Sequence, residues 1–303
     1  MRALFILCLL ACSTLCAGID EHAKVCVVMP CDTTRKAIVH KLQAEGFTNV
    51  VAEPCYDSKQ IRTLFEREKP EYVIVDGTDE ADMSRTLLID TQTLHEAYRQ
   101  GVKKCLLLSS FAIYPVGQKS PHKEDELTSL KVEEQKDPYA IAKLAALQLC
   151  HEYNDQKEPR FITCPHPFLF DAKTPLEQKL HNPVTEVLGR IAQAKQITRE
   201  FVLISNDGKA KYELLHISDL ASAVVFLLRH EVEYEIMNIG TGRETSMHQI
   251  ANFLYKGSGH KGELIFDATE FDVVPRQVLN SNRIQSMGWS PVTDTAAALK
   301  TPK

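Results

Sequence analysis

Residues 104–115 read KCLLLSSFAIYP, and this stretch is the clearest sign of the fold class in the chain. Residues 105–108 form a short, wholly apolar run, which is typical of a strand covered on both faces of a sheet. Two hydroxyl side chains, Ser109 and Ser110, stand where this strand would end. Because open α/β sheets bind ligands outside the carboxyl ends of their strands, the stretch predicts a buried parallel strand that delivers Ser110 to a site.

Similar apolar runs recur along the chain and alternate with segments of helical spacing. The runs cover residues 25–29, 49–52, 72–75 and 161–163, and the helical segments cover residues 34–45, 61–68, 87–99 and 138–153. Parallel strands need a crossover of about a dozen residues, commonly a helix, so the alternation predicts an α/β protein with a doubly wound, Rossmann-type parallel sheet. We assign residues 24–165 to this dinucleotide-binding core. Residues 166–303 are predicted to form a smaller, mixed α/β substrate lobe, interwoven with late elements of the core.

The overall composition excludes some classes of partner. The formal net charge is −5 and no basic run is present, which argues against a nucleic-acid partner. The nine cysteines show no CxxC or Cys/His spacing, so no metal site is expected. Thiols within apolar runs behave as small hydrophobic residues, so cysteine usage leaves the redox compartment open.

The N-terminal residues have the pattern of a targeting segment. A charged start, Met1-Arg2, is followed by apolar residues 3–12 and by mostly small residues at positions 13–18. This pattern predicts a signal peptide over residues 1–17 and a secretory or extracytoplasmic location. The apolar part is too short to span a bilayer, so no membrane span is expected in the mature chain. Alternatively, the leader is apolar by chance or the start codon is misassigned, and the protein is cytoplasmic.

Residues 137–143 read DPYAIAK and place Tyr139 and Lys143 one turn apart on a predicted helix. An ammonium beside a phenol lowers the phenol pKa from about 10, so Tyr139 is expected to exchange a proton with a substrate near neutral pH. Lys143 could also hold a nicotinamide ribose, and Ser110 could donate a hydrogen bond to the same carbonyl oxygen as Tyr139. The alternatives are an exposed helix pair and a capped strand end, but the combination of the two features favours a catalytic site.

A strand-end serine upstream of a helical YxxxK resembles the pattern of the extended short-chain dehydrogenase/reductases. From residue 24 to residue 295 the chain is similar to this family, and within it to the GDP-L-fucose synthases, which are NADP-dependent epimerase–reductases of a GDP-4-keto-6-deoxy sugar. The strongest similarity lies at residues 106–115, 138–154, 213–219, 238–242 and 266–289. The resemblance implies a nucleotide-sugar substrate, catalytic roles for Ser110, Tyr139 and Lys143, and a homodimer paired through the YxxxK helix.

The turn after the first strand departs from the family pattern. The family carries glycines there, so that backbone N–H groups and a helix N-terminus can approach the cofactor pyrophosphate. Residues 30–36 instead read PCDTTRK, without a glycine. Thr33 can still cap the helix and Arg35 can supply a positive charge, so both are candidate cofactor-binding residues.

Other positions bear on the choice of cofactor. Glu53 follows the second strand at the distance at which an acid binds a ribose 2′-hydroxyl, which would favour NAD over the NADP of the family. An exposed loop glutamate is the alternative. By the resemblance, Asp57 contacts the adenine, and residues 76–80, DGTDE, replace an alanine-rich turn and a glycine-containing loop beside the nicotinamide.

The resemblance also identifies candidate residues for epimerisation and for substrate binding. The epimerase cysteine of the family corresponds to Ala112, which cannot transfer a proton. The epimerase histidine corresponds to Asn182, so the adjacent His181 is a candidate catalytic residue and Asn182 a candidate substrate contact. Lys211, beside the position of a family arginine, and Arg276 are candidate contacts to the substrate phosphates.

Three hypotheses follow from these patterns. The first is the reductase and epimerase reaction of the family, catalysed through Ser110, Tyr139 and Lys143. The second is a related sugar oxidoreductase with a changed substrate. The third is a non-catalytic protein, exported if the leader is a signal peptide, that binds nucleotide sugars or other partners through the retained fold. Export would separate the protein from NADP and GDP-sugars, which are chiefly cytosolic.

Overall fold

A computed structural model of the chain describes residues 19–79, 82–115, 120–129, 135, 137–156, 160–171, 182–198, 200–267, 269 and 278–300. Residues 1–17, His181 and Arg276 lie outside the described residues. The signal peptide and the roles of these two side chains therefore stay predictions.

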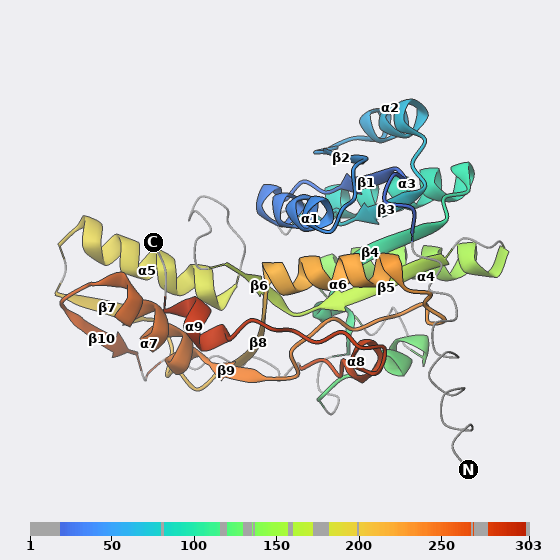
Figure 1. Ribbon diagram of the computed structural model, residues 1–303. Coiled ribbons are helices and arrows are strands. Elements are labelled where there is room, and N and C mark those ends of the chain that lie inside the picture. The colour runs from blue at the N-terminus through green and yellow to red at the C-terminus, as the bar shows by residue number, and fades with distance from the viewer. Residues whose placement is uncertain are drawn as a thin grey trace, which may run out of the picture.

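Five parallel strands form the central sheet. They are β1 (Val25–Val28), β2 (Val50–Glu53), β3 (Tyr72–Val75), β4 (Lys104–Ser110) and β5 (Arg160–His166), in the order β2-β1-β3-β4-β5 (Figure 1). Every residue of β1 and β3 is buried, which is why these strands contain almost only branched apolar side chains. The strand order reverses direction between β1 and β3, and ligands of doubly wound sheets bind at such a switch point.

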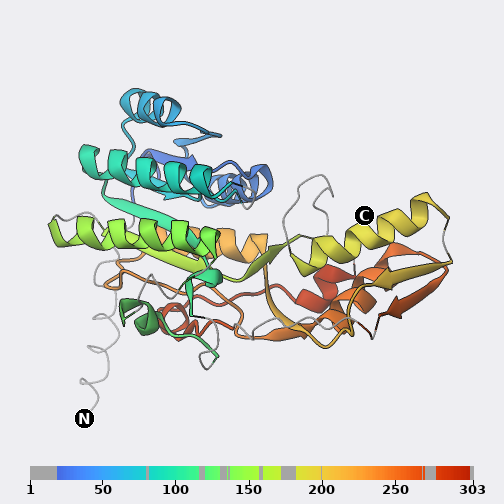
Figure 2. The same ribbon diagram turned by 180° about the vertical axis from the view of Figure 1, so that it is seen from behind.

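Helices cover both faces of this sheet. One apolar core packs α1 (Asp32–Ala44) and α6 (Ile217–Arg229) against one face, and a second core packs α2 (Ser58–Glu68), α3 (Met83–Gln100) and α4 (Pro138–Gln156) against the other. Figure 2 shows α3 and α4 side by side, and the rings of Tyr98 and Tyr153 stack between them with centroids 4.2 Å apart. The predicted α/β class and parallel sheet are confirmed.

Late segments of the chain return to this core. Besides α6, residues 235–239 run along the outer edge of β5. The amide of Thr163 donates to the carbonyl of Glu235 at 2.8 Å, and the amides of Met237 and Ile239 donate to the carbonyls of Thr163 and Pro165 at 2.9 and 2.8 Å. The polar backbone of the sheet edge is thereby paired.

The second lobe lies beside the sheet (Figure 1) and is built from short strands and helices. One small sheet contains β6 (Phe168–Phe170), β8 (Lys211–His216) and β9 (Glu244–Ser246), and another pairs β7 (Phe201–Ile204) with β10 (Glu263–Phe266). The helices α5 (Pro183–Gln196), α7 (Met247–Ser258) and α9 (Thr295–Leu299) contribute to its apolar core, whereas α8 (Asn282–Ser286) packs on the main core. Two short 3₁₀ helices, η1 (Phe111–Ile113) and η2 (Glu124–Ser129), follow β4.

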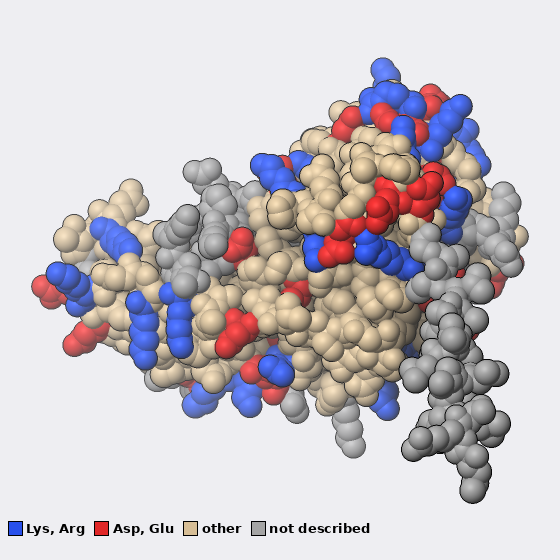
Figure 3. Space-filling model, viewed as in Figure 1, with Lys and Arg blue, Asp and Glu red and all other residues tan. Residues whose placement is uncertain are grey.

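Figure 3 shows Lys and Arg side by side with Asp and Glu over α2, so charges of both signs are mixed there. Within the part of the chain that the structure describes, no helix is both long and apolar enough to cross a membrane.

Glu213, on β8, joins β8 to two loops. Its buried carboxylate accepts hydrogen bonds from the amides of Thr241, Gly242 and Leu279 at 2.6, 2.7 and 2.7 Å. A Cβ atom on Gly240 would lie 2.6 Å from Oε1 of Glu213, so this close approach requires glycine. Glu213 therefore holds two loops in place: the loop that follows residues 235–239 and the loop that precedes α8.

We expect Glu213→Ala to lower the free energy of unfolding by about 3 kcal/mol or more, because several buried amides lose their acceptor. Urea-induced unfolding of the purified protein measures the change. Glu233→Ala, at an exposed position, serves as the control and should change the stability by less than about 0.5 kcal/mol. Equal stabilities of the two variants would contradict the role assigned to Glu213.

Candidate active site

The carboxyl ends of the parallel strands enclose a small cavity of about 80 Å³. Its lining comes from the start of α1, the loop after β3, the end of β4, the first turn of α4, the end of β5 with the residues that follow, and the N-cap of α5. The lining residues are Cys31, Thr34, Asp76, Thr78, Ser110, Tyr139, His166, Pro167, Leu169 and Asn182. Ser110 and Tyr139, identified from separate stretches of sequence, thus face one cavity.

Local hydrogen bonds position these two hydroxyl groups. Oγ of Ser110 accepts a hydrogen bond from the amide of Ala112 at 3.1 Å, which turns the chain into η1. The hydroxyl hydrogen of Ser110 remains available to an acceptor, because that bond uses only a lone pair. The hydroxyl of Tyr139 lies 3.1 Å from Oγ1 of Thr78, on the loop after β3. The hydroxyl of Thr78 donates its only hydrogen to Asp76, so the hydroxyl of Tyr139 donates to Thr78 in this structure. Tyr139 must turn this hydrogen from Thr78 toward an acceptor in the cavity, whereas Ser110 already has its hydrogen available.

Lys143 lies beneath the cavity floor in a buried ionic cluster, which we call the lysine cluster: Lys143, Asp76 and Asp90. Its side chain has no exposed surface, and Nζ lies 2.8 Å from Oδ1 of Asp76, 2.8 Å from Oδ2 of Asp90 and 3.2 Å from the carbonyl of Leu108. An ammonium has three N–H groups, so these three acceptors can use all of them. The two carboxylates outweigh the cost of burial and raise the pKa of Lys143 far above its usual value.

The expected lowering of the Tyr139 pKa is wrong. Burial raises the pKa of Tyr139 to about 12, and the attraction of Lys143 for a phenolate offsets this only in part. The carboxylates of Asp76 and Asp90 act against Lys143 and favour the neutral phenol. Tyr139 is therefore protonated at neutral pH, as a proton donor must be, although it is a weaker acid than the sequence suggested.

The turn at the start of α1 has its own internal contacts. The guanidinium of Arg35 donates to the carbonyls of Met29 and Pro30 at 2.7 and 3.2 Å and pairs with the carboxylate of Asp32. Its charge is thus directed back to the end of β1. Thr33 lies in the first turn of α1, but it is Thr34 that lines the cavity.

Of four other candidate site residues predicted from the sequence, only one lies at the cavity. Asn182 lines the cavity and caps α5, because its Oδ1 accepts the amides at positions 184 and 185, both at 2.9 Å. Asp57 caps α2 by accepting the amide of residue 60 at 2.8 Å. Glu53 pairs with the guanidinium at position 67, outside the cavity. Lys211 is exposed on β8, 4.0 Å from a carboxylate oxygen of residue 244, and does not line the cavity.

Asp76, Thr78 and His166 line the cavity but were not among the candidates from the sequence. Asp76 and Thr78 follow β3, and His166 is the last residue of β5, at the same edge as Ser110. The position of polar residues at strand ends is the signal that could have identified them. Nδ1 of His166 lies 2.9 Å from the carbonyl of Pro167, which can only accept a hydrogen bond. Nδ1 therefore carries the hydrogen, and in the neutral ring Nε2 has the lone pair. Burial lowers the pKa of His166, so the ring is neutral at pH 7.

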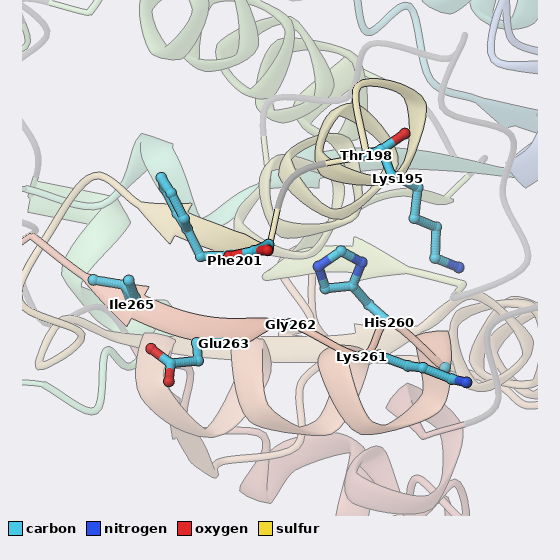
Figure 4. Close-up of a pocket in the computed structure, with 10 residues that line it drawn as sticks. Lys195, Thr198, Phe201, His260, Lys261, Gly262, Glu263 and Ile265 are labelled. Carbon is cyan, nitrogen blue, oxygen red and sulfur yellow. The ribbon is translucent and has the colours of Figure 1, made fainter.

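A larger hollow, of about 1020 Å³, lies in the second lobe between the end of α5 and the β7–β10 pair. Figure 4 shows the ring of His260 in this hollow, between Phe201 and Lys195. The hollow is open to solvent and contains none of the residues at the sheet edge, so we do not assign the chemistry to it. Among the described residues, no group of three His, Cys, Asp or Glu side chains could hold a metal ion.

At the strand ends of this parallel sheet, a serine lies beside the tyrosine of a helical YxxxK. This combination defines the class of short-chain dehydrogenase/reductases. The chain belongs to the NAD dependent epimerase/dehydratase family, whose model matches residues 33–240. This match begins after Cys31 and Asp32, within the turn that lacks glycine.

Curated relatives are similar along most of the chain. GDP-L-fucose synthase 1 of Arabidopsis thaliana is 32% identical over 288 residues, which cover 90% of this chain and 89% of the relative. GDP-L-fucose synthase of Escherichia coli strain K12 is 29% identical over 77% of this chain and 79% of its own length. The fold matches the structure of a GDP-mannoheptose C4 reductase from Campylobacter jejuni with NADP bound, at a TM-score of 0.78 and 24% identity over 93% of this chain and 98% of that chain.

Substitution of Lys143 tests how much the ion pairs of the lysine cluster contribute to the stability of the protein. We expect Lys143→Met to lower the free energy of unfolding by about 3–5 kcal/mol, because two carboxyl groups stay buried without their cation. Burial already raises the pKa of Asp90 in spite of Lys143, whereas Lys143 holds the pKa of Asp76 below its usual value against the effect of burial. Without Lys143 both pKa values rise further, so that both lie above that of an unfolded carboxyl, about 3.9. The native state then holds protons that the unfolded state releases, so the loss grows as the pH rises from about 5 to about 8.

Urea-induced unfolding at both pH values measures this effect. Lys103→Met is the matched control, because Lys103 pairs with Glu71 at the surface and its loss should change the stability by less than about 1 kcal/mol. A loss in Lys143→Met that is independent of pH would contradict the electrostatic account.

Proposed function

We propose that the protein binds a GDP-linked keto sugar and reduces it, with Ser110 and Tyr139 at the carbonyl oxygen. The observation that carries this proposal is the shared cavity of these two hydroxyl groups at the switch point of the sheet. Support also comes from the similarity to GDP-L-fucose synthases over 90% of the chain. The neutral phenol of Tyr139 donates the proton that the carbonyl oxygen takes up, and Ser110 stabilises the negative charge that develops there.

The residues fit a nicotinamide cofactor beside the cavity, where hydroxyl groups are present and the N-terminus of α1 carries no side-chain cap. Thr33 would hold its pyrophosphate and Asp57 its adenine. Arg35 would contribute only after its guanidinium leaves the carbonyls of Met29 and Pro30 and the carboxylate of Asp32. When bound, a reduced nicotinamide supplies the hydride. We propose NADP rather than NAD, because the guanidinium of Arg67, which pairs with Glu53 and Glu68, could donate a hydrogen bond to a 2′-phosphate.

Tyr139→Phe tests the reductase. With a GDP-4-keto-6-deoxy sugar and NADPH, we expect kcat/KM to fall by about 10²-fold or more, because the proton donor is lost. The absorbance of NADPH follows the reaction, and calorimetric titration with GDP should give an unchanged Kd. Tyr234→Phe, at an exposed position, is the control. An unchanged rate in Tyr139→Phe would contradict the assignment.

We propose that His166 supplies an acid–base group for epimerisation, in place of the missing thiol at Ala112. Its neutral imidazole has a lone pair on Nε2 and belongs to the same cavity as Tyr139. A base at this position can remove a proton from the carbon next to the keto group, which the carbonyl acidifies. His181 stays a second candidate for this role.

In deuterium oxide, the wild-type protein should exchange the protons next to the keto group of the sugar for deuterium, as observed by NMR. His166→Asn should slow this exchange by about 10²-fold. His230→Asn, whose ring lies at the end of α6, is the control. Retention of exchange in His166→Asn would assign the acid–base step to another group.

A second candidate function is binding of nucleotide sugars without catalysis. Two observations favour it: the turn at residues 30–36 lacks glycine, and the hydrogen bonds of Lys143 are directed to Asp76, Asp90 and Leu108. Binding of GDP without binding of NADPH or NADH, and no turnover, would establish this function over the reductase.

We also propose that residues 1–17 direct export. Their charged start and apolar run support a signal peptide and a secretory or extracytoplasmic location. Mass spectrometry of the protein expressed from the full reading frame should show an N-terminus near residue 18. A mature chain that still begins at Met1 in the cytoplasm would contradict the proposal.

A further inference from the structure

Asp76 holds Lys143 from the side of the cavity. Asp76 lines the cavity, whereas Asp90, the second carboxylate of the lysine cluster, comes from α3 and does not. Oδ1 of Asp76 accepts from Nζ of Lys143 at 2.8 Å and from the amide and hydroxyl of Thr78. Because Asp90 and the carbonyl of Leu108 bind the other two N–H groups, the donor directed to Asp76 is the one through which a ligand in the cavity could reach Lys143.

The loop after β3 holds Asp76 firmly in this position. The amide of Asp76 continues the sheet by donating to the carbonyl of Val28 at 3.1 Å. The next amide, of Gly77, donates to Oδ1 of Asp90 at 2.6 Å, and a Cβ at Gly77 would lie 2.8 Å from the same oxygen. The loop is thus packed on α3 by a contact that requires glycine, and Asp76 stands at the β1–β3 switch point.

The charge balance of the lysine cluster does not require Asp76. Two carboxylates surround one ammonium, so the cluster contains one more acidic group than basic group. Without Asp76, Lys143 and Asp90 would form a neutral buried pair, and the ammonium would have one N–H group facing the cavity. The carboxylate of Asp76 also adds a negative charge to the edge at which a dinucleotide would place its phosphates.

We propose that Asp76 restricts dinucleotide binding, because its carboxylate occupies the N–H group of Lys143 that a ribose hydroxyl would need. This inference rests on the proposed function, in which a nicotinamide cofactor binds beside the cavity. It assigns Asp76 as a specificity-determining residue. A dinucleotide must displace the Asp76 carboxylate before it can contact Lys143, whereas GDP binding does not involve this step.

The test is calorimetric titration of NADPH and NADH into the wild-type protein, Asp76→Ala and Asp76→Asn. We expect Asp76→Ala to lower the Kd of the dinucleotide by about tenfold or more, the worth of one charge-assisted hydrogen bond. Asp76→Asn keeps an oxygen that accepts from Lys143 but loses the charge, so its Kd should lie between the other two.

Asp90→Asn is the matched control, because it removes the other carboxylate of the lysine cluster on the side away from the cavity, and its Kd should not fall. Urea-induced unfolding identifies any variant that is not folded. If Asp90→Asn does not fold, the proposal is tested by the order of the dinucleotide Kd values, which should fall from wild type to Asp76→Asn to Asp76→Ala. A Kd in folded Asp76→Ala within twofold of the wild-type value, an equal gain in Asp90→Asn, or no dinucleotide binding by any variant overturns the proposal.

Titration with GDP separates this proposal from the proposed function. Tighter dinucleotide binding in Asp76→Ala without any binding of GDP supports the role of Asp76 and contradicts the GDP-sugar substrate. Binding of GDP and turnover by the wild-type protein, with the same dinucleotide Kd in Asp76→Ala, supports the proposed function and overturns the role of Asp76.

Discussion

The buried ammonium of Lys143 is the interaction on which the candidate site depends. A buried charge must be fully paired, and Lys143 meets this requirement through Asp76, Asp90 and the carbonyl of Leu108. These partners come from the loop after β3, from α3 and from β4, so one side chain of α4 joins three neighbouring elements. Through Asp76 and Thr78 the same network extends to the hydroxyl of Tyr139. The pairing that stabilises the floor of the cavity therefore also positions the hydroxyl of Tyr139.

Two departures from the family pattern lie where β1 and β3 end. The turn after β1 has Asp32 and a tethered Arg35 in place of glycines, and the loop after β3 begins with Asp76. Both changes place a carboxylate near the positions at which a dinucleotide would bring phosphates or a ribose. The hydroxyl groups of Ser110 and Tyr139 at the sugar end are retained. The chain thus keeps two hydroxyl groups at the cavity beside an altered turn and loop at the ends of β1 and β3.

Much of the fold and part of the site could be predicted from the sequence. Ser110 and Tyr139 were expected in one site because a strand end and a helix start at the same edge of a parallel sheet must lie close together. The internal roles of Asp57 and Arg35 were less predictable, because a short polar side chain near a helix start can cap the helix, bind a neighbour or face a ligand. His166 was not identified because prolines flank it on both sides, and prolines in a sequence usually indicate a turn rather than the end of a strand.

The architecture could be read from the sequence alone, because the spacing of apolar residues requires buried strands that alternate with helices whatever the remaining side chains do. The sequence also predicted that Ser110 and Tyr139 lie at the carboxyl edge, but not that Thr34 and Thr78 do. The protonation and the partners of these groups depend on the packing of the elements. Asp90 lies 53 positions and Asp76 67 positions from Lys143 along the chain, yet both contact its ammonium. A pKa depends on charges that are close in space, so the neutral phenol of Tyr139 became evident only when α3, α4 and the loop after β3 were packed together.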